Sequence, residues 1–227
     1  MSTMTVAGRR KVSDPLGAVE RYIRLRQRTI REFDLPGPGA LERLTLDEVV
    51  RTRRLSSRIS NAEAEEFRKG GVTIRRKLSR VPIATTIYEA DPETDEGVRV
   101  LEASHDLYVH LWDRFPRPPG GVSNGKISKV LHVKRPHLVP ILDGFLWRAY
   151  GPGAEEAERH HPIAVDGSPA RARWLAMRDD LVRNREQLGD VREALAHSQV
   201  WQEVAGDAST ERLSDLRLLD ILVWSKN

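Results

Sequence analysis

Residues 121–144 read GVSNGKISKVLHVKRPHLVPILDG and begin with a turn of small residues placed directly before a short predicted helix, about 124–132. The turn comprises Gly121, Val122, Ser123, Asn124 and Gly125. Successive backbone N–H groups of such a turn point the same way, and the helix dipole adds to them. We therefore predict a site here for an anion such as phosphate.

Asp143 lies at the other end of this segment, after the apolar run 139–142 and at the start of a second predicted helix, 143–150. An aspartate in that position caps the helix, and the helix dipole stabilises its ionised form. Two interpretations stay open: a fixed catalytic carboxylate, or an ordinary cap worth about 1 kcal/mol to the fold.

Four cations lie between the turn and Asp143. Lys126 and Lys129 are three residues apart and share one helix face, and Lys134 and Arg135 follow the helix. They are candidate contacts to the phosphates of DNA. The alternative is an ordinary solvated basic surface.

The pattern Gly-Val-Ser, Val-Leu and Pro-Ile-Leu-Asp-Gly in this segment resembles the helix-hairpin-helix motif with its trailing aspartate in the DNA glycosylase (HhH-GPD) superfamily. It is most similar to adenine-specific members. The resemblance covers about 30 residues. It implies that the hairpin glycines bind DNA phosphates and that Asp143, reached without a gap, is the catalytic aspartate.

The segment departs from the superfamily pattern at two positions. Ser123 replaces the second hairpin glycine, and Gly125 stands where lyase-type members carry a Schiff-base lysine. Lys126 is one residue later, about 100° around the helix, and is the second candidate catalytic residue. The resemblance therefore favours a monofunctional glycosylase. Residues 126–132, 134–136 and 217–224 also resemble signatures of an uncharacterised bacterial family.

The remaining sequence predicts an all-α, multi-helix domain. Asp14-Pro15 starts a helix, Thr45 with Glu48 and Ser60 with Glu63 form capping boxes, and Ser168-Pro169 starts another helix. A 3.6-residue period predicts a central buried helix over 95–115. Gly151-Pro152-Gly153 is expected to end the helix over 143–150. Further helices are expected over about 169–185, 188–201 and 214–224.

Two segments do not fit this helical pattern. Residues 1–13 are basic and lack periodicity, which predicts a disordered tail before a single helical domain, 14–227, with the helix-hairpin-helix segment at 121–150. Residues 72–86 are rich in β-branched side chains and could form an extended segment or a short pair of strands.

The composition excludes several classes of function. The 227 residues include no cysteine, which excludes disulfides, thiol nucleophiles and cysteine-held metal clusters. No apolar run is long enough to cross a membrane and the first residues lack a secretion signal, so we expect a soluble, cytoplasmic protein without cofactors. The histidine spacings do not fit a helical zinc pair, and we expect no metal.

The charge is unevenly distributed: residues 1–80 hold 19 Lys and Arg against 10 Asp and Glu. Such a basic excess favours nucleic acid, although the arginines of 21–31 also fit a solvated helix face. We expect a DNA-binding protein and possible DNA N-glycosylase in which Asp143 is the essential carboxylate. The alternatives are a non-catalytic DNA-binding or scaffold protein, and an enzyme acting on a small nucleoside-like or phosphorylated molecule.

Overall fold

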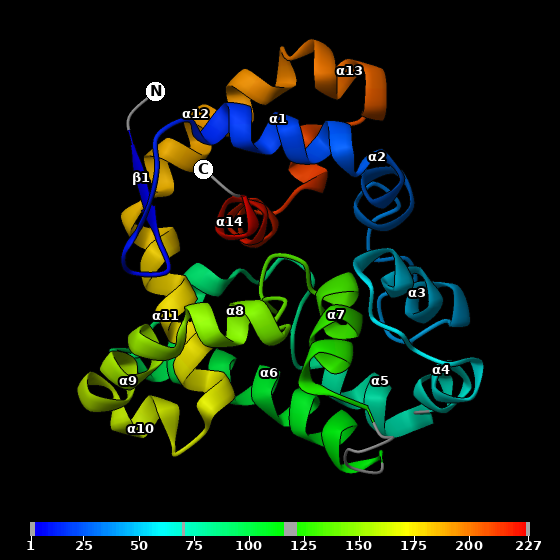
Figure 1. The fold of residues 1–227 in the computed structure, drawn as a ribbon. Coiled ribbons are helices and arrows are strands. Elements are labelled where there is room, and N and C mark those ends of the chain that lie inside the picture. Colours follow the sequence, from blue (N-terminus) through cyan, green and yellow to red (C-terminus); the bar gives the residue numbers. More distant parts are fainter. Residues whose placement is uncertain (1–2, 70, 116–121, 226–227) are drawn as a thin grey trace.

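The computed structural model describes residues 3–69, 71–115 and 122–225. Over these residues the fold is mostly α-helical with one antiparallel pair of strands (Figure 1). The first half contains β1 (Met4–Val6), β2 (Arg10–Val12), α1 (Pro15–Leu25), α2 (Gln27–Thr29), η1 (Ile30–Asp34), α3 (Leu46–Arg51), η2 (Thr52–Leu55), α4 (Asn61–Arg68), α5 (Gly71–Ser79), η3 (Ile87–Glu89) and α6 (Asp95–Asp113). The second half contains α7 (Asn124–Lys134), α8 (Gly144–Ala149), α9 (Gly151–His160), α10 (Pro162–Val165), α11 (Pro169–Arg183), α12 (Arg185–Ala196), α13 (Gln199–Ala205), η4 (Thr210–Arg212) and α14 (Asp215–Trp224).

The predicted helix starts are confirmed where a side chain caps the helix. Asp14 accepts a hydrogen bond from the backbone of Gly17, and the capping boxes of Thr45 and Ser60 are both complete. Ser168 caps α11 in the same way. These contacts span three residues of chain, so the local sequence is enough to specify them.

The N-terminal segment differs from the expected disordered tail, because residues 4–12 form a hairpin. Met4 lies opposite Val12, and Val6 opposite Arg10. Met4, Val6 and Val12 are at most 1% exposed, and β1 packs against α14. Burial of this apolar face stabilises a hairpin too short to persist by itself.

The strands expected within 72–86 are not formed, whereas the expected end of the helix over 143–150 is confirmed. Residues 71–79 form α5, in which Ile74 and Leu78, one turn apart, are buried. Among the described residues, the strand pair is instead the N-terminal one. The helix α8 ends at Ala149, and Gly151-Pro152-Gly153 begins a further helix, α9, because proline is compatible with the first turn of a helix.

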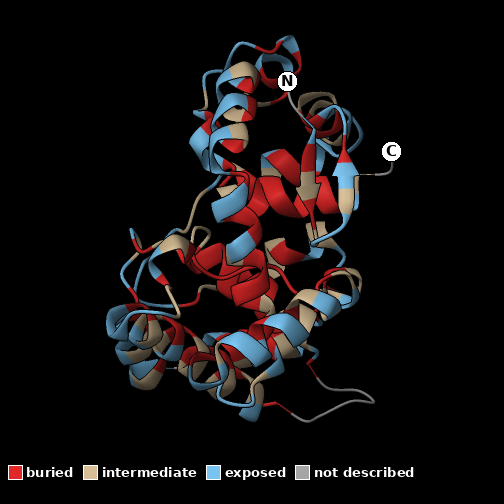
Figure 2. Cartoon of the chain, turned by 90° about the vertical axis from the view of Figure 1, so that its left-hand side faces the viewer, coloured by how far each residue is buried: buried red, intermediate tan, exposed pale blue. Residues whose placement is uncertain are grey.

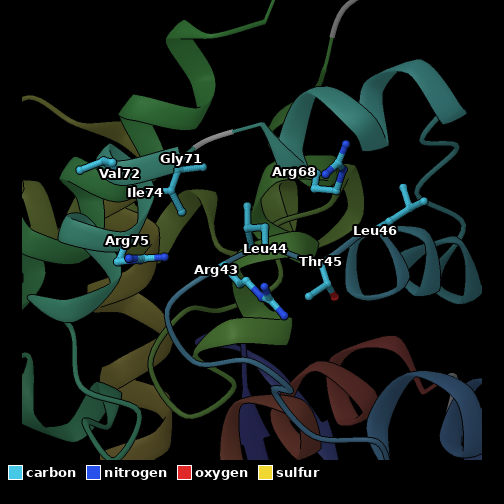
Figure 3. Close-up of a pocket in the computed structure, with 9 residues that line it drawn as sticks. All are labelled: Arg43, Leu44, Thr45, Leu46, Arg68, Gly71, Val72, Ile74 and Arg75. Carbon is cyan, nitrogen blue, oxygen red and sulfur yellow. The ribbon is translucent and has the colours of Figure 1, made fainter.

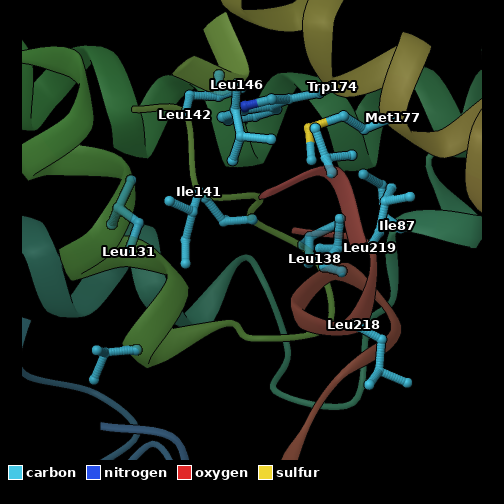
Figure 4. Close-up of a cluster of buried hydrophobic side chains, with 14 of the residues drawn as sticks. Ile87, Leu131, Leu138, Ile141, Leu142, Leu146, Trp174, Met177, Leu218 and Leu219 are labelled. Atoms are coloured by element: carbon cyan, nitrogen blue, oxygen red, sulfur yellow. The ribbon is translucent and has the colours of Figure 1, made fainter. Parts of the chain in front are cut away.

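The centre of the fold is α14, not the helix over 95–113. Every residue from Leu216 to Val223 is buried, and α14 lies between α1 and α8 (Figure 1). Buried residues gather in the middle of the molecule, while the outer helix faces are exposed (Figure 2). Leu218 and Leu219 from α14 belong to the same apolar cluster as Leu146 and Trp174 (Figure 4).

In the described part of the chain, no helix is long and apolar enough to span a membrane.

His132 on α7 gives the stability a predictable dependence on pH. It is 3% exposed, its Nδ1 donates to the carbonyl of Val139 at 2.8 Å, and burial lowers its pKa from 6.5 to about 3. Below pH 6.5 the unfolded chain binds a proton that folded His132 does not bind. The stability from this residue is therefore lost as the pH falls from 6.5 towards 3.

We expect His132 to lower the free energy of unfolding by about 2 kcal/mol between pH 7 and pH 5. Urea titrations at both pH values measure this loss. The His132→Gln variant, which keeps a side-chain donor but does not titrate, should lose about 2 kcal/mol less than the parent over the same interval. If the free energy of unfolding had the same pH dependence in the parent and the variant, the lowered pKa of His132 would be contradicted.

Candidate functional site

The side chain of Asp143 is held at the N-terminus of α8 by backbone N–H groups of that helix. Its Oδ1 accepts hydrogen bonds from the N–H groups of Phe145 and Leu146, each at 3.0 Å. Its Oδ2 accepts none from the described residues. The predicted cap is therefore confirmed, and one carboxylate oxygen is left without a partner in a half-buried position.

Asp143 lies in the wall of a cleft of about 800 Å³. We call it the Asp143 cleft. Its walls come from α1, α2, η2, α7, the N-terminal half of α8, and α14. Its charged lining residues are Arg21, Arg26, Arg54, Lys129, Asp143, Arg148, Arg217 and Asp220. These segments are far apart in the sequence, so the cleft exists only in the folded chain.

The start of α7 packs directly against the backbone of Asp143. A side-chain carbon at Gly125 would lie 3.3 Å from the Asp143 Cα and 3.6 Å from its Cβ. Gly125 therefore lets α7 approach the start of α8 closely. A side chain at this position would crowd the backbone of Asp143, and glycine itself offers no amine for a step of the lyase type.

Lys129, one helical turn after Gly125, places an amine in the Asp143 cleft. The residue is 6% exposed, and its Nζ donates to the carbonyl of Leu55 at 2.6 Å. Burial lowers the pKa of Lys129, and the charges of Asp143 and Asp220 partly oppose this effect. Lys129 is therefore not a solvated surface cation. It links α7 to the end of η2.

Arginines line the cleft on three sides. Arg21 and Arg26 come from α1 and the residue after it, Arg54 from η2, and Arg148 from α8. Arg21 pairs with Asp14 and Arg54 with Glu32, whereas no ion pair found among the described residues includes Arg26 or Arg148. The cleft therefore offers guanidinium groups to an anionic ligand.

Aromatic rings complete the cleft. Phe145 and Trp224 pack with their ring centroids 4.5 Å apart, and Trp224 is 45% exposed. Tyr22 lines the opposite wall on α1. The position of Trp224 at the last turn of α14 leaves its ring partly in solvent.

The structure does not bring the other predicted cations into the cleft. Lys126 Nζ donates to Glu63 at 2.6 Å and joins α7 to the cap of α4, so Lys126 is not placed to react beside Asp143. Lys134 is fully buried and pairs with Glu48. Arg135 is 3% exposed and donates to the carbonyl of Leu78 at 2.7 Å.

The interpretation of Lys134 and Arg135 as phosphate contacts is therefore corrected. Lys134 also donates to the carbonyls of Pro38 and Ala40, and Arg135 also donates to that of Val81. Both cations are surrounded by acceptors of their own chain, which satisfies charges that would be costly to bury unpaired. They are structural residues.

The predicted anion-binding turn, 121–125, is described from Val122 onward. Gly121 lies outside the described residues. Val122 is 2% exposed, and the Ser123 hydroxyl accepts from the N–H of Lys126 at 3.4 Å, which caps α7. Asn124 is half-buried in the first turn of α7. The described part of the turn therefore acts as a helix start beside Asp143.

A second cavity, of about 470 Å³, lies at α4 and α5 (Figure 3). Arg43, Arg68 and Arg75 line it together with apolar side chains. Arg68 pairs with Glu65, and Arg75 lies 3.9 Å from Glu42. No carboxylate among the described residues lines this cavity, so it differs from the Asp143 cleft in having cations without an acid. Among the described residues, no cluster of three or more His, Asp or Glu side chains could hold a metal ion.

Two groups in the cleft were missed from the sequence. The arginines of 21–31 were interpreted as a solvated helix face, yet Arg21 and Arg26 line the cleft. Asp220 lies in the segment 217–224, which resembles a family signature, and it was not predicted as a site residue. Its signal is a charge inside the apolar run LLDILVW, which indicates a buried carboxylate.

Comparison with known proteins gives one match. The model of a family of unknown function (DUF6308) matches residues 16–227, which include every element that lines the cleft. Searches of curated proteins and of solved structures found no match. The chemistry of the site must therefore be argued from its own geometry.

The two lysines at the ends of α7 should differ in their effect on stability. Lys134→Ala leaves the buried Glu48 without its cation, which should lower the free energy of unfolding by about 3–5 kcal/mol. Lys126→Ala removes a pair that is partly open to solvent, which should cost about 1 kcal/mol or less. Urea unfolding of both variants measures these losses. Equal losses in the free energy of unfolding would contradict the greater burial of the Lys134–Glu48 pair.

Proposed function

Because the chain belongs to DUF6308, a family of unknown function, we propose a function on the geometry of its cleft: it binds DNA and hydrolyses an N-glycosidic bond with Asp143 as the essential carboxylate. The observation that carries this proposal is the free Oδ2 of Asp143 in a cleft lined by arginines. A carboxylate alone could serve many reactions. A carboxylate among phosphate-binding groups narrows the choice to phosphate-bearing substrates.

Asp143 can stabilise the positive charge that develops on the sugar as the bond to the base breaks. A carboxylate about 4 Å from that charge contributes about 4 kcal/mol at an effective dielectric constant near 20. This equals about a thousandfold in rate. Water then attacks the anomeric carbon, and the products are the free base and the sugar hydroxyl.

The dimensions and the lining of the cleft support a single extruded nucleotide as the substrate. A volume of about 800 Å³ lies in the range of small-ligand sites. The faces of Phe145, Trp224 and Tyr22 offer surfaces on which a base can stack. An enzyme that cleaves the bond to a base must first take that base out of the duplex.

In this proposal the arginines of the cleft supply phosphate contacts in place of the buried Lys134 and Arg135. Arg26 and Arg148 have no ion-pair partner among the described residues, so binding a phosphate breaks no existing pair. The resemblance of residues 121–144 to the helix-hairpin-helix glycosylases adds support, since it points to the same Asp143. A Schiff-base step is not part of the proposal, because Gly125 and the paired Lys126 provide no amine there.

Asp143→Asn tests the proposed chemistry. Asparagine caps helices about as well as aspartate, so the melting temperature should change little. Release of base from duplexes that contain hypoxanthine, 7-methylguanine, or adenine opposite 8-oxoguanine should fall about a hundredfold or more, because the negative charge is lost. Duplex affinity should stay within about threefold of the parent.

The matched control is Asp91→Asn, the same change at an aspartate whose Oδ1 also accepts a backbone N–H, that of Glu93, and which lies outside the cleft. It should leave base release unchanged. A parent protein that binds these duplexes but releases no base is a non-catalytic DNA-binding protein. Cleavage of free nucleosides without affinity for duplex DNA assigns the cleft to small molecules.

The double variant Arg26→Glu, Arg148→Glu tests the DNA contacts. Loss of two phosphate contacts should weaken binding to any duplex about tenfold or more and reduce the slope of log affinity against log salt by about 2. The matched control is Arg99→Glu, Arg159→Glu, which makes the same charge change at exposed positions on α6 and α9. Equal losses of duplex affinity in both variants would mean that DNA binding depends only on the net charge of the protein.

A further inference from the structure

Asp220 on α14 has an unexplained carboxylate oxygen. The residue is 3% exposed, and its Oδ2 accepts a hydrogen bond from Nη1 of Arg217. Its Oδ1 has no hydrogen-bond partner, and it is the one oxygen in this state among the buried side chains of the described residues. Native proteins rarely leave such an acceptor unsatisfied, so it needs an explanation in function or in a missing partner.

Asp220 belongs to the same cleft as Asp143. Asp220 lines the cleft from the α14 side, whereas Asp143 lines it from the start of α8. The two carboxylates interact electrostatically, and each has a different environment. Asp143 accepts two backbone N–H groups, while Asp220 is buried with one oxygen unpaired. Two carboxylates with different surroundings in one site are the usual arrangement for separate acid and charge-stabilising roles.

The burial of Asp220 favours retention of its proton towards neutral pH. Burial raises the pKa of Asp220 to about 6, with Arg217 opposing the shift and the negative charges of Asp143 and Asp34 adding to it. The titratable and charged groups that interact with it are Arg217 of α14, Asp34 of η1, Tyr22 of α1, Lys129 of α7, Asp143 before α8, and Tyr150 after α8. A general acid works best when it exchanges its proton close to the working pH.

We propose that Asp220 is the general acid of the Asp143 cleft, which gives the proton on Oδ1 to the departing base; this inference rests on the proposed function. The bond between the sugar and the base nitrogen breaks, and its electron pair stays on the base. The proton of Asp220 neutralises that base. Water adds to the anomeric carbon, and the proton that water loses returns the pair of carboxylates to its starting state, so one water is consumed for each base released.

A purely structural role as a partner of Arg217 is the competing explanation. The molecule offers a matched control, because Asp34 also pairs with Arg217, at 2.8 Å, and is equally buried. Asp34 does not line the Asp143 cleft. Asp34→Asn and Asp220→Asn therefore remove comparable partners of the same guanidinium, but only the second change removes an acid from the cleft.

The test compares two leaving groups in duplex DNA. Hypoxanthine leaves as a neutral base and needs a proton, whereas 7-methylguanine is already cationic and leaves without one. In single-turnover assays, Asp220→Asn should release hypoxanthine about a hundredfold or more slowly than the parent. Its release of 7-methylguanine should stay within about threefold of the parent. Asp34→Asn should affect the two substrates equally.

The parent protein alone provides a second readout, which holds even if a variant does not fold. Its release of hypoxanthine should fall about tenfold for each pH unit above 6, while release of 7-methylguanine should be flat between pH 6 and pH 8. A flat profile for hypoxanthine, release of 7-methylguanine alone, or equal losses in the Asp34 and Asp220 variants would overturn the assignment. A parent that releases none of the three bases, hypoxanthine, 7-methylguanine and adenine opposite 8-oxoguanine, overturns the proposed function itself, which separates the two failures.

Discussion

The buried guanidinium of Arg217 is the interaction around which the molecule is arranged. Its nitrogens donate to Asp34 at 2.8 Å, to the hydroxyl of Tyr22 at 2.7 Å, and to Asp220 on its own helix. A charge removed from water is tolerated only when such partners surround it. Because Tyr22 lies on α1 and Asp34 on η1, the requirement for partners fixes α14 in the centre of the fold and sets the distance between the two walls of the cleft.

The need of buried Arg217 for charged partners links the stability of the fold to the charges in the cleft. The apolar residues of α14 provide the driving force for its burial, and Arg217 with Asp220 is carried into the interior with them. Asp34 and Asp220 together balance the guanidinium, but only Asp220 faces the cleft. The negative charge in the cleft is thus a consequence of how the core is neutralised, and Asp143 adds a second carboxylate from α8.

The helix starts could be predicted, whereas the surroundings of the cations could not. The caps at Asp14, Thr45, Ser60 and Asp143 depend on N–H groups two or three residues away, so the sequence contains all that they need. The helix over 71–79 was missed because β-branched side chains favour strands only when no packing surface opposes them. Its burial of Ile74 and Leu78 against other helices outweighs that preference.

The sequence by itself determined the position of one carboxylate. An apolar run, an aspartate and a helix start follow one another at Asp143, and this order specifies a helix cap. It also determined a mostly helical fold, since the spacing of apolar side chains reflects a period within one segment. The tertiary structure alone decided which charges lie in the cleft. Lys134 and Arg135, close to Asp143 in sequence, are buried against distant carbonyls, while Arg26 and Asp220 come from segments more than 70 residues away on either side. The solvent exposure of a side chain depends on which distant elements of the chain pack over it. The local sequence pattern does not specify those elements.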